Sequence, residues 1–100
     1  MGYAPRWRDE LTDQLCSAFL TLKTEEECCR FLEDLCTIGE IQALAQRLEA
    51  AKMLAAGDTY DIITATTGMS TATISRVKKF LHYGADGYKL VLDRLVETEK

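Results

Sequence analysis

The chain has 100 residues, of which 47% are hydrophobic and 28% charged, and it carries a formal net charge of −4 at pH 7. This composition, which includes a single proline, excludes a disordered chain and predicts one folded domain over residues 1–100. No apolar run approaches the roughly 18 residues of a membrane span, and no signal peptide precedes Trp7, so we expect a cytoplasmic protein without membrane contact.

Apolar side chains recur every three or four residues along the chain, which predicts an all-α fold with about six helices. The expected helices cover residues 8–22, 25–36, 39–56, two short segments within 60–82, and 87–97. We expect Asp9 in the first turn of the first helix, Thr24 and Glu27 as a capping box for the second, and Gly57 at the end of the third. The side chains expected to be buried on the first three helices include Leu11, Leu15, Phe19, Leu35, Leu44 and Leu48.

The four cysteines are Cys16, Cys28, Cys29 and Cys36, and the single histidine, His82, is distant from them in sequence. Because their spacing matches no common zinc pattern, we expect no metal or cofactor and interpret the cysteines as core residues, with Cys29 and Cys36 the most buried. No nucleophile has a histidine nearby in sequence, and no phosphate-binding glycine loop is present. We therefore expect no catalytic residue and no enzyme.

Residues 60–81 read YDIITATTGMSTATISRVKKFL, a pattern typical of a helix-turn-helix spanning about residues 60–82. Gly68 falls at the turn, where a residue that tolerates a positive φ is needed, and Ser70 can cap the next helix. Ile63, Ile74 and Val77 stand where the two helices must bury side chains against each other. The alternative interpretation is a pair of short amphipathic helices joined by a glycine turn, as in many small bundles.

The positive charge of the chain is concentrated in the second of these helices. Residues 71–82 contain Arg76, Lys78, Lys79 and His82 and no acidic residue. Residues 1–70 contain six Lys and Arg against twelve Asp and Glu, whereas residues 71–100 contain six against four. A single cationic helix on an acidic protein favours a localised contact with phosphates over non-specific coating of nucleic acid.

Residues 44–81, LAQRLEAAKMLAAGDTYDIITATTGMSTATISRVKKFL, resemble the tryptophan-repressor superfamily, and more closely the YerC/YecD family of TrpR-related bacterial proteins. The run ATISR after the turn, ahead of a lysine-rich helix, is the most specific part of the match. The resemblance implies a TrpR-like fold in which two chains intertwine as a homodimer. It also implies sequence-specific binding to double-stranded DNA, with two recognition helices entering successive major grooves.

The resemblance assigns DNA-contacting roles to Ser70, Thr71, Ala72, Ser75, Arg76, Lys78 and Lys79. The base-facing residues are expected to be Thr71, Ala72, Ser75 and Arg76, with partly water-mediated readout and a guanine contact available to Arg76. Lys78 and Lys79 are expected to contact phosphates, and Ser70 to cap the helix whose free amides could face a phosphate.

Tryptophan-binding members of the superfamily clamp their ligand between two arginines, and Arg47 and Arg76 match those positions. The glycine that makes room for the indole ring in those members is Val77 here, and Asp34 replaces a leucine in the partner-chain wall. We therefore expect that tryptophan does not bind. The two arginines then have alternative roles: one pairs with a nearby carboxylate while the other contacts DNA, or both hold an unidentified small co-repressor.

Two function classes follow. The leading hypothesis is a homodimeric, sequence-specific DNA-binding transcriptional regulator, a repressor that occludes a promoter. The alternative is a non-enzymatic protein-interaction or assembly module that has kept the helical fold but lost DNA affinity. DNA affinity that falls steeply with salt distinguishes the first from the second.

Overall fold

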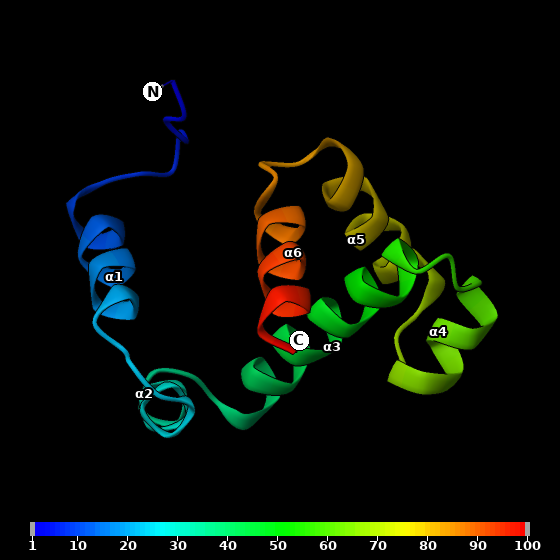
Figure 1. Cartoon of the computed structure of the whole chain (residues 1–100), viewed down its shortest axis with the longest axis horizontal. Coiled ribbons are helices and arrows are strands. Elements are labelled where there is room, and N and C mark those ends of the chain that lie inside the picture. Colours follow the sequence, from blue (N-terminus) through cyan, green and yellow to red (C-terminus); the bar gives the residue numbers. More distant parts are fainter. Residues whose placement is uncertain (1, 100) are drawn as a thin grey trace. The chain divides into compact units, whose positions relative to one another are not determined.

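The computed structural model describes residues 2–99, and the side chains of residues 2–98. The described chain contains helices and no strand, which confirms the all-α prediction (Figure 1). The six helices are α1 (Glu10–Leu20), α2 (Glu25–Leu35), α3 (Ile38–Ala55), α4 (Tyr60–Thr67), α5 (Thr71–Tyr83) and α6 (Gly87–Glu99). Of these, none is long and apolar enough to cross a membrane, as far as the described residues extend.

The chain divides into two units, an N-terminal unit of residues Met1–Ile38 and a C-terminal unit of residues Gly39–Lys100. The N-terminal unit contains α1 and α2, and the C-terminal unit contains α4, α5, α6 and all but the first residue of α3.

Helix α1 begins later than its sequence pattern predicts, because Asp9 is its N-cap and not a residue of its first turn. The N–H of Thr12 donates to the Asp9 carboxylate at 2.8 Å, and the N–H of Asp9 donates to the Thr12 hydroxyl at 2.8 Å. Hydrogen bonds from the Thr12 backbone and side chain hold the pKa of Asp9 below its ordinary value. This reciprocal capping satisfies two amides that a helix start would otherwise leave without partners.

Helix α2 begins as expected, with Thr24 as its N-cap and the Glu27 N–H donating to the Thr24 hydroxyl at 3.1 Å. The Glu27 carboxylate accepts from the N–H of Lys23 at 2.8 Å, one residue earlier than the capping-box prediction places it. The rings of Phe19 and Phe31 pack edge to face with their centroids 5.1 Å apart, which joins α1 to α2.

Gly57 ends α3, as expected, with a φ of 89° that favours glycine. Its N–H donates to the carbonyl of Leu54 at 3.1 Å, and the N–H of Asp58 donates to the carbonyl of Met53 at 3.0 Å. This pair of bonds is the Schellman arrangement, which satisfies two carbonyls at a helix end. The chain turns there, and Thr59 caps α4.

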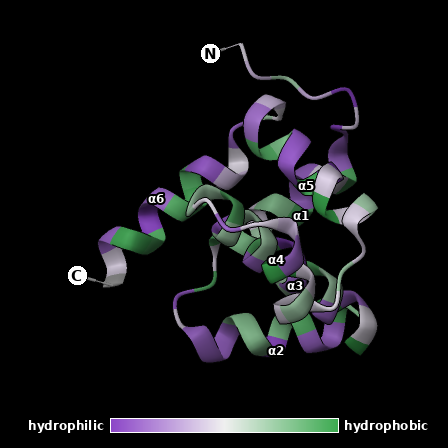
Figure 2. Ribbon diagram, turned by 90° about the vertical axis from the view of Figure 1, so that its right-hand side faces the viewer, coloured by the Kyte–Doolittle hydropathy of each residue, from purple (hydrophilic) through white to green (hydrophobic). Residues whose placement is uncertain are grey.

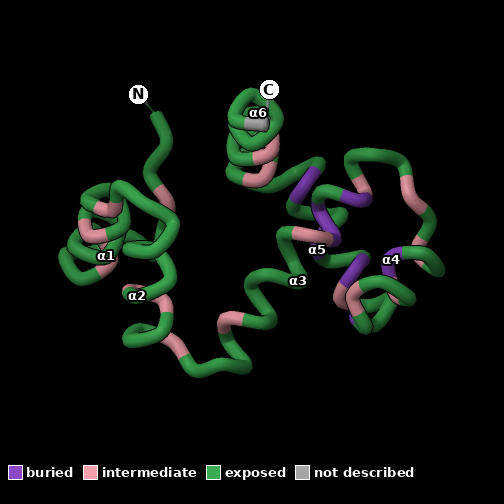
Figure 3. The backbone as a smooth tube through the Cα atoms, turned by 60° about the horizontal axis from the view of Figure 1, so that its bottom comes forward, coloured by how far each residue is buried: buried purple, intermediate pink, exposed green. Residues whose placement is uncertain are grey.

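The buried side chains lie in the C-terminal unit, where α3, α4 and α5 meet (Figure 3). They are Ala50, Ala51, Met53, Ile63, Met69, Ile74, Val77 and Leu81. The predicted burial of Ile63, Ile74 and Val77 is confirmed. Tyr60, Leu54, Tyr88 and Leu92 are partly buried and pack against this cluster.

The N-terminal unit has no such core, since none of the residues of α1 and α2, all of them described, is buried. The predicted burial of apolar side chains on the first three helices is wrong for the six residues Leu11, Leu15, Phe19, Leu35, Leu44 and Leu48, which are 38% to 74% exposed. The expected burial of Cys29 is also wrong because its side chain is exposed, although Cys36 is partly buried. Two helices of 11 residues each are too short to bury their apolar faces by packing against each other alone, so apolar side chains stay exposed in the single chain. Figure 2 shows hydrophobic and hydrophilic residues alternating along α2 and α6, as in helices with one apolar face.

Cysteine thiols do not gather into a metal site. Cys16 and Cys28 are exposed, and no group of three His, Cys, Asp or Glu side chains within the described part of the chain could hold a metal ion.

Candidate nucleic-acid interface

Helices α4 and α5 form a helix-turn-helix joined by residues 68–70. Gly68 has a φ of 77°, and its N–H donates to the carbonyl of Thr64 at 2.8 Å, which ends α4. Met69 follows with only 6% of its surface exposed and belongs to the buried cluster that contains Ile63 and Ile74. Ile63 of α4 and Ile74 of α5 are fully buried, so the two helices are held to each other by aliphatic packing.

The start of α5 presents small side chains. Ser70 is the N-cap, as expected, because its hydroxyl accepts from the Thr73 N–H at 3.2 Å. Thr71 and Ala72 follow in the first turn and are exposed. A helix start with short, exposed side chains can approach another surface closely.

The exposed face of α5 carries the predicted contact residues in two adjacent rows. Thr71, Ser75 and Lys78 follow one another at spacings of four and three residues, and Ala72, Arg76 and Lys79 do the same one position further along. These spacings place each row along one side of a helix. All six residues are exposed, whereas Ile74, Val77 and Leu81 fill the buried side. The structure therefore brings six of the seven residues to which the resemblance assigns a DNA contact onto one face of α5, and the seventh, Ser70, caps the start of the same helix.

Tyr60 contacts this face, a role that sequence reasoning missed. The Ser75 hydroxyl donates a hydrogen bond to the Tyr60 hydroxyl at 3.3 Å, and the Lys78 Nζ lies 5.8 Å from the centre of the Tyr60 ring. Tyr60 is 15 residues before Ser75, so no short-range pattern connects them. The helix-turn-helix pattern itself could have indicated this contact, because this motif brings the start of its first helix beside the middle of its second.

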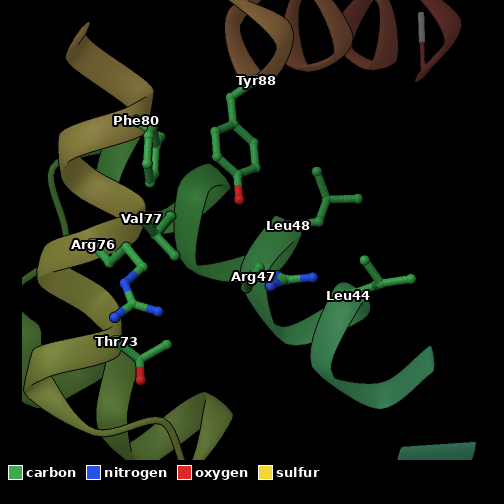
Figure 4. A pocket seen from close by; sticks show the side chains of 8 residues that line it. All are labelled: Leu44, Arg47, Leu48, Thr73, Arg76, Val77, Phe80 and Tyr88. Atoms are coloured by element: carbon green, nitrogen blue, oxygen red, sulfur yellow. The ribbon is translucent and has the colours of Figure 1, made fainter. Parts of the chain in front are cut away.

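Arg47 and Arg76 line a common cavity of about 350 Å³ between α3 and α5, shown in Figure 4. The other lining residues are Leu44, Leu48, Thr73, Val77, Phe80 and Tyr88. Among the described side chains, neither arginine forms an ion pair, so the expected pairing of one of them with a nearby carboxylate is not found. The cavity thus combines two exposed cations with a largely apolar wall.

Val77 forms part of that wall and is only 2% exposed. Its branched side chain also packs into the cluster that contains Ile63 and Ile74. The cavity wall beside Arg76 is therefore formed by a branched side chain that the core holds in place.

Comparisons with known proteins agree with this architecture. The Trp repressor protein family matches residues 10–96 of the chain. "Uncharacterized protein YerC" of Bacillus subtilis (strain 168) is 60% identical over 92 residues, which are 92% of this chain and 88% of that protein. The crystal structure of a TrpR like protein from Eubacterium eligens ATCC 27750 is similar with a TM-score of 0.85 and 51% identity, covering 88% of this chain and 91% of that one.

A crystal structure from Staphylococcus aureus is similar to the same extent, with a TM-score of 0.84, 52% identity and 88% coverage of both chains. The family match covers both helices of the helix-turn-helix and includes most residues of each of the two units. The chain therefore belongs to the Trp repressor protein family.

Proposed function

We propose that this protein is a sequence-specific DNA-binding transcriptional regulator, a repressor that occludes a promoter in the bacterial cytoplasm. The observation that carries the proposal is the construction of α5. Its buried side fixes the helix on α4, and its exposed side carries Arg76, Lys78 and Lys79 without an acidic neighbour on the helix. A cationic helix face held rigidly on an acidic protein directs phosphate contacts to one place.

The proposed contacts follow the two rows of the exposed face. Thr71, Ala72, Ser75 and Arg76 read base edges in the major groove, and Lys78 and Lys79 contact phosphates. Ser70 caps the helix, and the free amides beside it face a phosphate. Phosphate contacts set the position of the helix, and base contacts set the preferred sequence.

We also propose that the protein acts as a homodimer, in which residues 1–100 of each chain work as one domain. The support is the apolar surface that one chain leaves exposed, including Trp7 at 61%, Leu11 at 74% and Ile38 at 76%. Large apolar side chains left this exposed favour an interface, and a second copy would supply a matching apolar face.

Tryptophan does not regulate this protein, under our proposal, because Val77 fills the ring position beside Arg76. Arg76 then contacts DNA. The competing role for Arg47 and Arg76 is to bind a different small co-repressor. DNA selection with and without added metabolites distinguishes this role from the DNA contact of Arg76.

The test is selection of bound duplexes from fragmented bacterial genomic DNA without added ligand. We compare the wild-type protein with Arg76→Ala/Lys79→Ala, and we use Lys89→Ala/Arg94→Ala on α6 as a control that removes the same charge elsewhere. We expect a palindromic site with the wild-type protein and the control, and no enrichment with the α5 variant. A plot of the logarithm of the binding constant for that site against the logarithm of the salt concentration should have a slope of about −0.9 for each neutralised phosphate.

Absence of enrichment from a folded wild-type dimer would contradict ligand-independent DNA binding. Enrichment that appears only after bacterial metabolites are added would favour the co-repressor role of Arg47 and Arg76. No enrichment under either condition would favour the interaction-module function instead.

A further inference from the structure

We propose that Tyr60 sets base specificity by fixing the Ser75 hydroxyl as a hydrogen-bond acceptor, so that Ser75 reads the exocyclic amino group of adenine or cytosine. The proposal rests on the DNA-binding function proposed above and names the chemical group that one residue of that interface recognises.

A side-chain hydrogen bond joins the two helices of the helix-turn-helix. The Ser75 Oγ donates to the Tyr60 Oη at 3.3 Å, which links the middle of α5 to the first residue of α4. The Tyr60 ring is partly buried and packs against the cluster formed by Ile63, Ile74 and their neighbours. Because the core holds the ring, the phenol oxygen stays at a fixed point beside Ser75.

The hydrogen-bonding capacity of the Ser75 hydroxyl determines what it can offer to a base. A hydroxyl has one proton to donate and two lone pairs that accept. When the proton is directed to Tyr60, the lone pairs are what Ser75 presents to an approaching DNA groove. A serine without this bond can rotate its hydroxyl and serve as donor or acceptor alike.

The major groove distinguishes these two cases. Adenine N6 and cytosine N4 carry amino groups that donate, whereas guanine O6 and N7 and thymine O4 accept. A Ser75 restricted to accepting therefore favours a base with an amino group at the position it faces. Guanine or thymine at that position places two acceptors against each other.

The contact with Lys78 supports the same role for the Tyr60 ring. The Lys78 ammonium lies 5.8 Å from the ring centre, within the range of a cation–π interaction, and Lys78 is one helical turn beyond Ser75. One ring thus orders a base-reading hydroxyl and a phosphate-facing ammonium before DNA arrives. The proton of the Tyr60 hydroxyl is still available to a phosphate oxygen.

The competing interpretation is that Tyr60 serves only to pack the core. Tyr60→Phe separates the two, because it keeps the ring and its packing and removes only the oxygen. If Tyr60 only packs, this variant leaves base preference unchanged.

The experiment uses the full-length dimer and the palindromic site selected by the wild-type protein. Binding constants are measured for all four base pairs at each position, with the wild-type protein, Tyr60→Phe, Ser75→Ala and the double variant. The position read by Ser75 is the one whose preference is lost in Ser75→Ala. We expect adenine or cytosine to be favoured there by about three- to tenfold in the wild-type protein, the value of one hydrogen bond.

We expect Tyr60→Phe to lose this preference at that position alone, and the double variant to match Ser75→Ala. Lys78→Met serves as the contrast: it weakens binding at every sequence and, because both chains of the dimer carry it, lowers the salt slope by about two phosphate contacts. Thermal unfolding of Tyr60→Phe provides the check that the fold is unchanged.

Retention of the preference by Tyr60→Phe, or a wild-type preference for guanine or thymine, would overturn the inference while leaving the DNA-binding function intact. A wild-type protein that selects no site at all would overturn the DNA-binding function itself.

Discussion

Gly84 lies so close to Phe80 that a methyl group does not fit between them. The N–H of Gly84 donates to the Phe80 carbonyl at 3.0 Å, and a Cβ built on Gly84 would be 2.4 Å from that carbonyl oxygen. The backbone that ends α5 and leads to α6 therefore depends on glycine at this position. A carbonyl of a helix cannot move aside as a flexible side chain can.

Gly84→Ala is expected to lower the free energy of unfolding by about 1–3 kcal/mol, because the end of α5 must shift to relieve the contact. Gly87→Ala is the matched control: a Cβ there meets nothing within 4 Å, and alanine at the start of α6 should raise stability by up to about 1 kcal/mol. Urea unfolding measures both. Equal effects of the two substitutions would contradict the steric argument.

Leu11→Glu is expected to weaken the proposed dimer. Leu11 is 74% exposed in one chain, so the substitution should change the stability of a lone chain by no more than about 0.5 kcal/mol. In the dimer the substitution would place a charge against apolar surface, which makes the free energy of association less favourable. The mass measured by light scattering should therefore shift from twice 11.2 kDa towards 11.2 kDa. Ser17→Glu, on the other side of α1, should leave the mass unchanged. A wild-type protein that stays a folded monomer near 11.2 kDa on its own would rule out the dimer.

Titration with millimolar tryptophan is expected to give no saturable heat, because under the proposed function Val77 fills the ring position beside Arg76 in the cavity that both residues line. The same titration with Val77→Ala tests the steric cause, since the shorter side chain enlarges the cavity beside Arg76. Saturable heat with the wild-type protein would show that Val77 does not block the ring.

Asp9 is expected to stabilise α1 at neutral pH and to lose this effect in acid. Its pKa is held below the ordinary value by the hydrogen bonds from Thr12, so the folded state favours the carboxylate. The stabilisation is complete above the pKa of the unfolded chain and is lost as the pH falls through the lower pKa of the folded chain. NMR titration of the Asp9 carboxyl carbon measures the shift. Asp9→Asn, which keeps an oxygen for the cap and removes the charge, should remove the part of the pH dependence that Asp9 contributes to α1.

Features that depend on neighbours in sequence could be predicted from the chain alone. Gly57 and Gly68 end helices because a positive φ favours glycine, and Ser70 caps α5 because its hydroxyl reaches an amide three residues on. The burial of Ile63 and Ile74 follows from helical spacing in the same way.

Features that depend on distant partners could not be predicted. Helical spacing predicted that Leu11 and Cys29 are buried, which is wrong for the single chain. Spacing identifies one face of a helix, but it cannot say whether the same chain supplies a layer to cover that face. The bond between Tyr60 and Ser75 joins residues 15 apart and depends on how α4 and α5 cross. The roles of the seven residues assigned to DNA contact stay predictions until binding is measured.

The division of α5 into a buried and an exposed side has a consequence for how this fold can evolve. Ile74, Val77 and Leu81 hold the helix in place, while the residues proposed to face DNA contribute little to the core. Exchanges at positions 71, 72 and 76 should therefore alter stability by only about 0.5 kcal/mol. Under the proposed function, such a protein can acquire a new operator by single substitutions, and duplicated copies can diverge to control different genes while sharing one scaffold.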